Sequence, residues 1–225
     1  MAVLSSPTRN SISIGKGYLR AKRILDIVFT LLILVPLGVV IVIFAVLIRI
    51  DSKGPIFFRQ KRVGMNGVEF DIFKLRSMYT DCDDSVHRES IKQYLNGATL
   101  NGKAHSGHQY KLVDDPRVTR IGRFIRKTSI DELPQFINVL RGEMALVGPR
   151  PPVPYEVAEY DSRDWLRLSG KPGLTGTWQI YGRSRVPFKE MVEMDIEYLE
   201  QQSILQDLKL VALTVPVMLQ GRGGA

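Results

Sequence analysis

The chain begins with one long apolar segment, and shorter segments of mixed apolar and polar residues follow it. Residues 27–48 form a run of 22 residues without a single charge. As a straight helix this run would be about 33 Å long, close to the roughly 30 Å of a bilayer's hydrocarbon core. A soluble protein rarely needs such a run. The pattern therefore predicts a helix embedded in a membrane.

The way in which this helix enters the membrane is left open by the residues alone. Pro36 lies near the middle of the run and removes one backbone donor, which favours a kink or a break. Basic residues flank both ends, so the tendency of cations to mark the cytoplasmic side does not separate the ends. Two topologies remain, a kinked spanning helix and a helix that dips into one leaflet and returns. The flanking cations are Arg20, Lys22 and Arg23 before the run, and Arg49, Lys53, Arg59, Lys61 and Arg62 after it.

Beyond the membrane segment, the pattern changes to short elements separated by glycine and proline. Residues 56–63 and 68–76 resemble two strands around a Gly-Met-Asn-Gly turn, which favours a β-hairpin. Apolar residues at helical spacing predict a helix over 188–199. The run 208–219 is too short to span a bilayer and suits an interfacial helix. We expect a mixed, mostly helical α/β domain lying against the membrane, preceded by a flexible N-terminal tail.

Composition adds a basic charge balance to this picture. The 225 residues carry 31 Lys and Arg against 23 Asp and Glu, a net charge of +8. Such a balance favours an anionic partner, which is nucleic acid, acidic lipid or a phosphorylated substrate. One cysteine, Cys82, excludes an internal disulfide. The histidines of the polar stretch 80–112 lack the partners of a metal site.

The richest candidate chemistry lies in residues 117–135, where arginines and Lys127 precede the adjacent carboxylates Asp131 and Glu132. Pro134 is tolerated in a first helical turn, which predicts Asp131 as the N-cap of a helix. One interpretation is purely structural, a capping carboxylate on the favourable end of the helix dipole. The other is a carboxylate nucleophile, kept ionised because nearby cations lower its pKa while they also neutralise a diphosphate.

Two later segments carry further candidate phosphate ligands. Arg150 stands between prolines in residues 146–152, and rigid flanks reduce the entropy lost when an arginine binds an anion. Residues 170–183 form a glycine-dense loop with a cation at each end, and backbone donors in such loops bind phosphate. Each segment considered alone also suits an ordinary surface loop.

Taken in order, these motifs resemble the bacterial sugar transferase family, the monotopic polyprenyl-phosphate phosphoglycosyl transferases. The resemblance extends from about Lys22 to Leu219 and is weakest through residues 82–113. Its strongest part is the stretch Arg-Lys-Thr-Ser-Ile-Asp-Glu-Leu-Pro-Gln at 126–135. The other matching segments are 22–26, 54–60, 73–78, 147–151 and the Gly-Leu-Thr-Gly-Thr-Trp-Gln loop at 173–179.

The resemblance implies a particular topology and domain organisation. It implies a tail over 1–21, a re-entrant membrane helix over 22–50 that bends at Pro36, and a catalytic domain over 51–225. The domain would lie on the cytoplasmic face of the bacterial inner membrane. The chain resembles the small, catalytic-core form of the family, without a preceding bundle of spanning helices.

The resemblance also implies a two-step reaction. Asp131 would attack the sugar-bearing phosphate of a UDP-sugar and release UMP, and polyprenyl phosphate would then take the phosphosugar from the aspartate. Mg²⁺ would bridge Asp131 and the diphosphate, and Glu132 would orient or deprotonate groups nearby. Arg126 and Arg150 match the family's phosphate-binding arginines, and Lys74 is a further candidate.

Other functions are weaker alternatives on the same residues. A membrane-anchored glycosyltransferase would attack the sugar carbon and release UDP, and a scaffold for polysaccharide assembly would use the basic face only to hold lipid. The apolar helix and the dispersed arginines disfavour nucleic acid as the partner. The identity of the sugar, the polyprenol length and a homodimeric state are not encoded in any pattern that we can decode.

Overall fold

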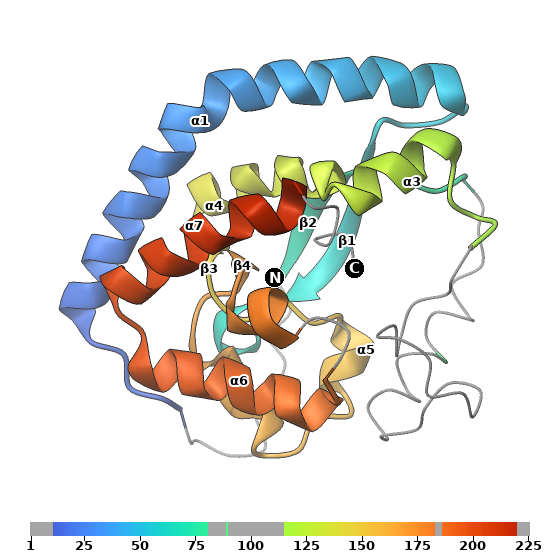
Figure 1. Ribbon diagram of the computed structural model, residues 1–225. Helices are drawn as coiled ribbons and strands as arrows, with labels where there is room; N and C mark the ends of the chain where they lie inside the picture. The colour runs from blue at the N-terminus through green and yellow to red at the C-terminus, as the bar shows by residue number, and fades with distance from the viewer. Residues whose placement is uncertain (1–10, 81–88, 90–114, 183–185, 220–225) are drawn as a thin grey trace.

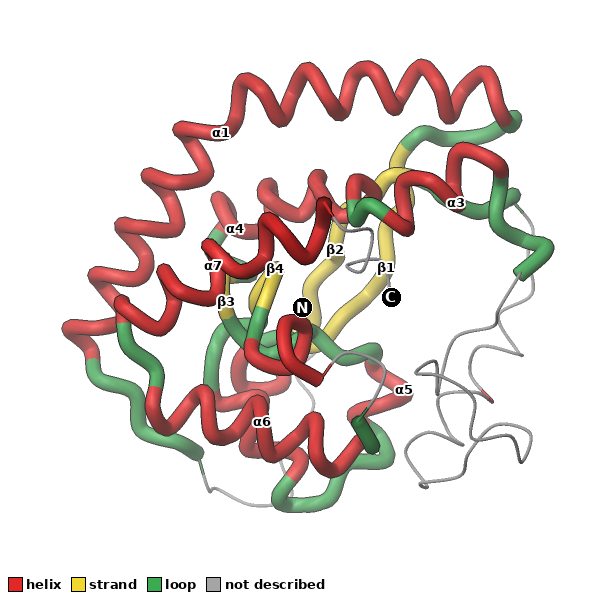
Figure 2. Tube along the Cα trace, viewed as in Figure 1, coloured by secondary structure: helices red, strands yellow, loops and turns green. Residues whose placement is uncertain are grey.

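The structure, a computed structural model, describes residues 11–80, 89, 115–182 and 186–219. One very long helix follows the outer edge of the molecule, and most of the remaining elements are helices (Figures 1 and 2). The strands form two small sheets of two strands each. The expected mixed, mostly helical α/β class is confirmed. The predicted histidine-bearing stretch and Cys82 lie outside the described residues.

Helix α1 spans Lys16–Asp51 and contains Pro36 in its interior. The ribbon changes direction partway along this helix (Figure 1). Three polar side chains at four-residue spacing, Lys22, Asp26 and Thr30, are buried on one face, while large apolar side chains such as Leu32 and Val35 are exposed on others. Only 11% of its most apolar 18-residue window is buried inside the protein. A core helix would be covered, so α1 indicates membrane association.

The predicted hairpin is confirmed. Strand β1, Phe57–Val63, pairs antiparallel with β2, Glu69–Leu75, in a register that places Phe57 opposite Leu75. The turn between them includes the short 3₁₀ helix η1, Met65–Gly67, where Asn66 and Gly67 both have positive φ. Asparagine and glycine tolerate this left-handed conformation, which explains why the chain reverses there.

The remaining elements enclose a core built from distant parts of the chain. One apolar cluster joins Ile72 of the hairpin to Val147, Leu199 and Leu210. A second surrounds Trp178, and a third joins Ile48 of α1 to the hairpin. The elements are α3 Arg120–Lys127, η3 Ile130–Gln135, α4 Phe136–Arg141, β3 Ala145–Val147, α5 Pro154–Val157, η4 Asp164–Ser169, β4 Gly173–Thr175, the π-helical η5 Trp178–Gly182, α6 Phe188–Gln201 and α7 Ile204–Leu219.

The N-terminal boundary differs from the expectation. Helix α1 begins at Lys16, within the predicted tail, and not at residue 22. The residues just before it are attached to the domain, because Ile12 and Ile14 pack against the core and the Ile12 amide donates to Ser169 Oγ at 3.1 Å. The predicted helix over 188–199 is confirmed as α6, and the run 208–219 forms most of α7.

Candidate active site

Ser129, a residue in the left-handed conformation, precedes the short helix η3 that carries the adjacent carboxylates Asp131 and Glu132. Helix α3 ends at Lys127, and Ser129 has φ 58°, an uncommon conformation for a residue other than glycine. The following 3₁₀ helix η3 holds Asp131 and Glu132 in its first turn, with the Glu132 amide donating to the Ser129 carbonyl at 3.1 Å. Strain of this kind is common where a chain positions functional groups.

The predicted N-cap is therefore wrong by two residues. Ser129, and not Asp131, occupies the cap position, and Asp131 lies inside the first turn. The short 3₁₀ helix accommodates Pro134 further along than a regular α-helix start would, which shifts the boundary towards the N-terminus. The structural interpretation of Asp131 as a capping carboxylate loses its basis. Asp131 is instead a buried acidic side chain with 8% of its surface exposed.

Lys74 is a predicted site residue that lies directly beside Glu132. Strand β2 packs against η3 and places Lys74 Nζ 2.7 Å from Glu132 Oε1, although the two residues are 58 positions apart. Their side chains are 20% and 42% exposed, so the pair is reachable from solvent. The hairpin thus supplies a cation to Glu132, the residue after Asp131.

Arg150 lies in the segment between β3 and α5. Strand β3 pairs in parallel with β4, and Arg150 follows β3 by three residues. This pairing needs glycine, because a Cβ on Gly173 would lie 2.1 Å from the Gly148 amide nitrogen. The Arg150 guanidinium lies over the Trp178 ring, 5.9 Å from its centroid. The glycine-dense loop of the sequence is thereby placed next to a predicted phosphate ligand.

Arg62 is a cation of this region that the sequence analysis did not assign to the site. It is buried in β1, and burial together with the charge of Arg150 lowers its pKa to about 10, while Glu156 and Glu132 act in the opposite direction. Its charge therefore links Arg150 to Glu132 in one electrostatic neighbourhood. The available signal was an arginine on the inward side of a predicted strand, alternating with exposed Lys61.

Arg126 occupies the last turn of α3, five residues before Asp131. Its carbonyl accepts a hydrogen bond from the Ser129 amide at 3.3 Å. The pKa of the Asp115 carboxyl is lowered by hydrogen bonds from Arg117, and the charge of Arg126 lowers it further. Arg126 is thus placed by the same turn that carries the carboxylates, and its predicted contact with phosphate stays a prediction.

The donor set suits a hard divalent cation that a substrate completes. Mg²⁺ is usually bound by one or two carboxylates together with phosphate oxygens of a substrate. Asp131 and Glu132 provide adjacent carboxylates in one turn, and within the described ranges no group of three or more His, Cys, Asp and Glu gathers at one place. The residues therefore fit an ion that a diphosphate helps to hold, and do not form a complete protein cage.

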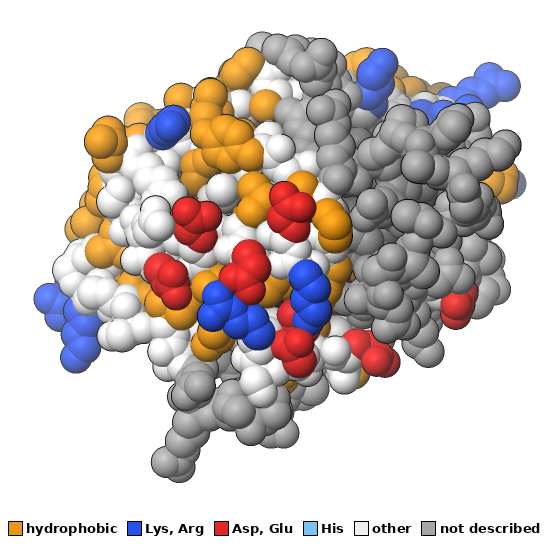
Figure 3. Space-filling model, turned by 60° about the horizontal axis from the view of Figure 1, so that its bottom comes forward, with side chains coloured by type: hydrophobic (Ala, Val, Ile, Leu, Met, Phe, Trp, Pro, Cys, Tyr) orange, Lys and Arg blue, Asp and Glu red, His pale blue; other side chains and the backbone are white. Residues whose placement is uncertain are grey.

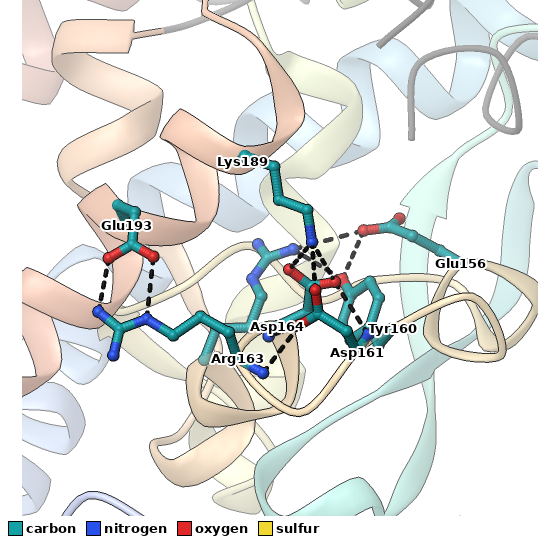
Figure 4. Close-up of polar contacts among 8 residues, drawn as sticks. Glu156, Tyr160, Asp161, Arg163, Asp164, Lys189 and Glu193 are labelled. Atoms are coloured by element: carbon teal, nitrogen blue, oxygen red, sulfur yellow. Dashed lines mark hydrogen bonds and ion pairs between the residues drawn. The ribbon is translucent and has the colours of Figure 1, made fainter. Parts of the chain in front are cut away.

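A second charged cluster lies between η4 and α6, and there cations and carboxylates are paired. Arg163 meets Glu193 at 2.6 Å, and Lys189 meets Asp161 at 2.7 Å and Asp164 at 2.8 Å (Figure 4). Figure 3 brings the bottom of the molecule forward and shows blue and red side chains interleaved on that face. This charge pattern is typical of a solvated surface.

Beneath this surface, Arg167 is fully buried between two acids. Its Nη2 lies 2.6 Å from Asp195 Oδ2, and its Nη1 lies 2.7 Å from the Tyr160 hydroxyl and 3.4 Å from Glu156 Oε1. Burial lowers the pKa of Arg167, but Tyr160 and the two carboxylates more than offset this and raise it overall. The side chain is therefore a permanently charged, fully surrounded group.

Comparison with known proteins places the chain in a family. Residues 17–221 match the family model for bacterial sugar transferases. The chain is 47% identical over 208 residues to the galactosyl transferase CpsE of Streptococcus agalactiae, covering 92% of this chain and 44% of CpsE. It is 39% identical over 205 residues to the exopolysaccharide production protein ExoY of Sinorhizobium fredii, covering 90% of this chain and 87% of ExoY.

The name of a third relative includes undecaprenyl phosphate. The chain is 38% identical over 203 residues to the undecaprenyl-phosphate galactose phosphotransferase of Salmonella typhimurium, covering 90% of this chain and 41% of that protein. The chain thus spans less than half the length of CpsE and of the Salmonella relative, and most of the length of ExoY. The chain belongs to the bacterial sugar transferase family.

Proposed function

We propose that this chain is an undecaprenyl-phosphate sugar phosphotransferase that catalyses the first membrane step of exopolysaccharide synthesis. The observation that carries the proposal is the placement of Asp131 and Glu132 in one strained turn beside Lys74, with Arg62 and Arg150 in the same electrostatic neighbourhood. An anionic nucleophile can approach an anionic diphosphate only where cations reduce their repulsion. Family membership supports the same reaction.

The proposed first step is attack by a carboxylate oxygen of Asp131 on the sugar-bearing phosphorus of a UDP-sugar. The bond from this phosphorus to the bridging oxygen breaks, and UMP leaves with the electron pair. In the second step, a phosphate oxygen of undecaprenyl phosphate attacks the same phosphorus. The bond to Asp131 breaks, and the carboxylate is restored for another turnover.

The neighbouring residues act on charge and position. Lys74 holds Glu132 at 2.7 Å, which fixes the second carboxylate beside the nucleophile. Arg150 and Arg126 would bind phosphate oxygens of the donor, since guanidinium groups match phosphate geometry. Asp131 would hold Mg²⁺, which would supply Lewis-acid stabilisation of charge on the transferring group. Glu132 would orient or deprotonate groups around them.

The acceptor explains why the domain is attached to a membrane. The apolar tail of a polyprenyl phosphate remains in the bilayer, so the nucleophilic site must lie at headgroup depth. The exposed apolar faces of α1 place apolar surface where lipid would cover it. Cations beside α1 add attraction to anionic lipid of about 1 kcal/mol for each well-placed charge.

We propose further that α1 is re-entrant and that both its ends lie on the cytoplasmic side. Its first half is held to the domain by ion pairs and hydrogen bonds. Lys22 Nζ lies 2.6 Å from Asp207, Arg23 Nη2 donates to the Leu140 carbonyl at 2.7 Å, and Asp26 accepts from the Leu146 amide at 3.1 Å.

The second half of α1 contacts the same domain through different elements. Phe44 stacks on Phe124 of α3 with ring centroids 5.8 Å apart, and the Ile121 amide donates to Asp51 at 3.0 Å. A straight helix of 36 residues would separate its ends by about 54 Å. Contacts of both halves with one domain, together with the bend in Figure 1, support a helix that returns to the side from which it entered.

Cysteine accessibility tests this topology. Single cysteines replace exposed Arg20 and Lys53 in a Cys82→Ser background, and membrane-impermeant maleimide is applied to sealed vesicles of each orientation. Both positions should label from the cytoplasmic side only, and Pro36→Leu should move them to opposite sides by straightening the helix. Labelling of the two positions from opposite sides in the parent protein would contradict the re-entrant topology.

Nucleotide release tests the reaction. Purified protein in nanodiscs receives Mg²⁺, undecaprenyl phosphate and a panel of UDP-sugars. Release of UMP supports phosphosugar transfer, and the best donor in the panel identifies the sugar. Release of UDP would move the chemistry to the sugar carbon and would overturn the proposal. Absence of either nucleotide across a broad panel would favour the scaffold.

A further inference from the structure

The segment Pro149 to Pro152 has every backbone carbonyl held by a hydrogen bond from outside the segment. The donors come in order from the Gly173 amide at 2.9 Å, Arg167 Nη2 at 3.2 Å, Arg62 Nη1 at 2.8 Å and the Val63 amide at 2.9 Å. Three of the four residues are prolines and have no N–H. The carbonyls are therefore the main means by which the surrounding fold can orient this backbone.

Two of these four donors are buried arginines from separate elements. Arg62 comes from β1 and is 6% exposed, and Arg167 comes from η4 and is 1% exposed. Burying a guanidinium is costly unless its donors are satisfied. Each arginine has a further partner, Gln60 for Arg62 at 2.8 Å and Asp195 for Arg167 at 2.6 Å, while the buried Nε atoms of both have no hydrogen-bond partner among the described residues.

We infer that Arg62 and Arg167 are positioning residues. They hold the backbone at Arg150 in one conformation, so that its guanidinium loses less conformational entropy when it binds a phosphate. Neither side chain needs to touch substrate for this role. Arg167 donates a hydrogen bond to the carbonyl of Arg150 itself, and Arg62 donates one to the carbonyl of Pro151, the next residue. The inference rests on the proposed function, in which Arg150 is a phosphate ligand.

The geometry distinguishes this role from simple ion pairing. Nη2 of Arg167 donates to both Asp195 and the Arg150 carbonyl. Asp195 therefore orients the guanidinium that holds the backbone at Arg150. A lysine at 167 would keep the charge opposite Asp195 and Glu156 but has a single nitrogen to share among all these partners. A lysine at 62 would likewise keep the charge beside Arg150 and lose the fork that joins Pro151 to Gln60.

A double-mutant cycle with Arg150 tests the inference. The variants are Arg62→Lys, Arg167→Lys and Arg150→Gln, singly and in pairs, with Arg163→Lys at the exposed N-cap of η4 as the matched control. The affinity for UDP, a probe that carries the diphosphate without the sugar, is measured by calorimetry in nanodiscs. UMP release gives kcat/KM, and thermal unfolding gives stability.

Each lysine variant should weaken UDP binding and kcat/KM by roughly tenfold, the scale of a displaced binding group. In the Arg150→Gln background each should add less than about twofold, because a positioning residue acts only through the residue that it positions. Arg163→Lys should match the parent protein. Full activity of the folded lysine variants, or losses that multiply with that of Arg150→Gln, would overturn the inference.

The design separates the inference from the reaction on which it rests. If the parent protein binds UDP but releases no UMP, the proposed function is wrong and the cycle on UDP binding still decides the positioning role. If Arg150→Gln leaves UDP binding unchanged, both the phosphate contact and its positioning are overturned. Should Arg167→Lys fail to fold, Arg62→Lys decides alone, since it acts from a different element.

Discussion

The two charged regions of this protein use the same residue types in different ways. Between η4 and α6, each of Arg163, Lys189 and Arg167 lies within 4 Å of at least one carboxylate. Around η3, by contrast, the buried Arg62 has its pKa lowered by burial and by the neighbouring Arg150. Lys74 is paired with Glu132 at this site too, so the difference lies in Arg62 and Arg150, whose mutual repulsion a bound anion would relieve.

The comparison shows why the net charge of +8 indicated an anionic partner without locating its site. Charge summed along a sequence counts Arg163 and Arg150 alike. The fold shows that Arg163 forms an ion pair with Glu193, whereas Arg150 lies over Trp178 and close enough to Arg62 to lower its pKa. The closeness of two arginines in the fold, and not the number of basic residues, distinguishes the candidate site.

Removing the proposed nucleophile should have the largest effect. Asp131→Asn keeps the shape of the side chain and should lower turnover by at least about 10³-fold, since the amide cannot form the phosphoryl bond. The measurement is UMP release in nanodiscs. Asp71→Asn, an exposed acid on the neighbouring strand β2, is the control and should keep full turnover. Retention of most activity in Asp131→Asn would refute the assignment.

The buried and exposed ion pairs of the second region should differ in their effect on stability. Asp195→Asn removes one partner of a fully buried ion pair, and we expect a loss of about 3 kcal/mol in the free energy of unfolding, at the low end for such pairs. Denaturant unfolding measures it. Glu193→Gln, in an exposed pair, should change stability by no more than about 0.5 kcal/mol. Equal losses for the two variants would show that burial does not separate these pairs.

Replacing a cation in each region sharpens the contrast. Arg150→Gln should lower kcat/KM by roughly 30-fold, about 2 kcal/mol of transition-state stabilisation, because a phosphate would lose a charged donor. Arg163→Gln should leave kcat/KM unchanged within error. Steady-state UMP release measures both. A comparable loss in Arg163→Gln would mean that the two regions serve catalysis alike.

The smallest effect concerns the surface pair and its pH dependence. The Lys189 hydrogen bond lowers the pKa of Asp161 to about 2 from its usual 3.8. A lowered carboxyl pKa stabilises the fold above about pH 4, and this stabilisation disappears as the pH falls towards 2. Asp161→Asn, which leaves the contact of Lys189 with the buried Asp164 in place, should therefore cost less than about 1 kcal/mol at pH 7, as is typical of exposed pairs. Stability measured from pH 7 down to about pH 2 should show the two proteins converging at the low end.

Local signals in the sequence predicted the elements that local physics determines. The hairpin was found because Asn66 and Gly67 favour the positive φ that its turn requires. The helix α6 was found from the spacing of its apolar residues. The predicted N-cap of η3, Asp131, lies two residues after the observed one, Ser129. Serine rarely adopts positive φ, so no pattern in the sequence indicated this turn.

Long-range contacts account for what the sequence could not predict. The strands β3 and β4 have three residues each and pair across a separation of 28 residues, which leaves no local pattern. The attachment of Ile12 and Ile14 to the core, the pair of Lys74 with Glu132 and the role of buried Arg62 depend on the same kind of contact. The sequence motifs predicted the candidate residues, and the structure showed which residues they contact.

The central claim is that the sugar-bearing phosphate passes through Asp131. The most direct test mixes the protein in nanodiscs with its best UDP-sugar, labelled with ³²P on that phosphate, without acceptor, and quenches within one turnover. The label should appear on the protein, be absent in Asp131→Asn and transfer to lipid when undecaprenyl phosphate is added. Label that stays in UDP, or that remains bound in Asp131→Asn, would contradict the account.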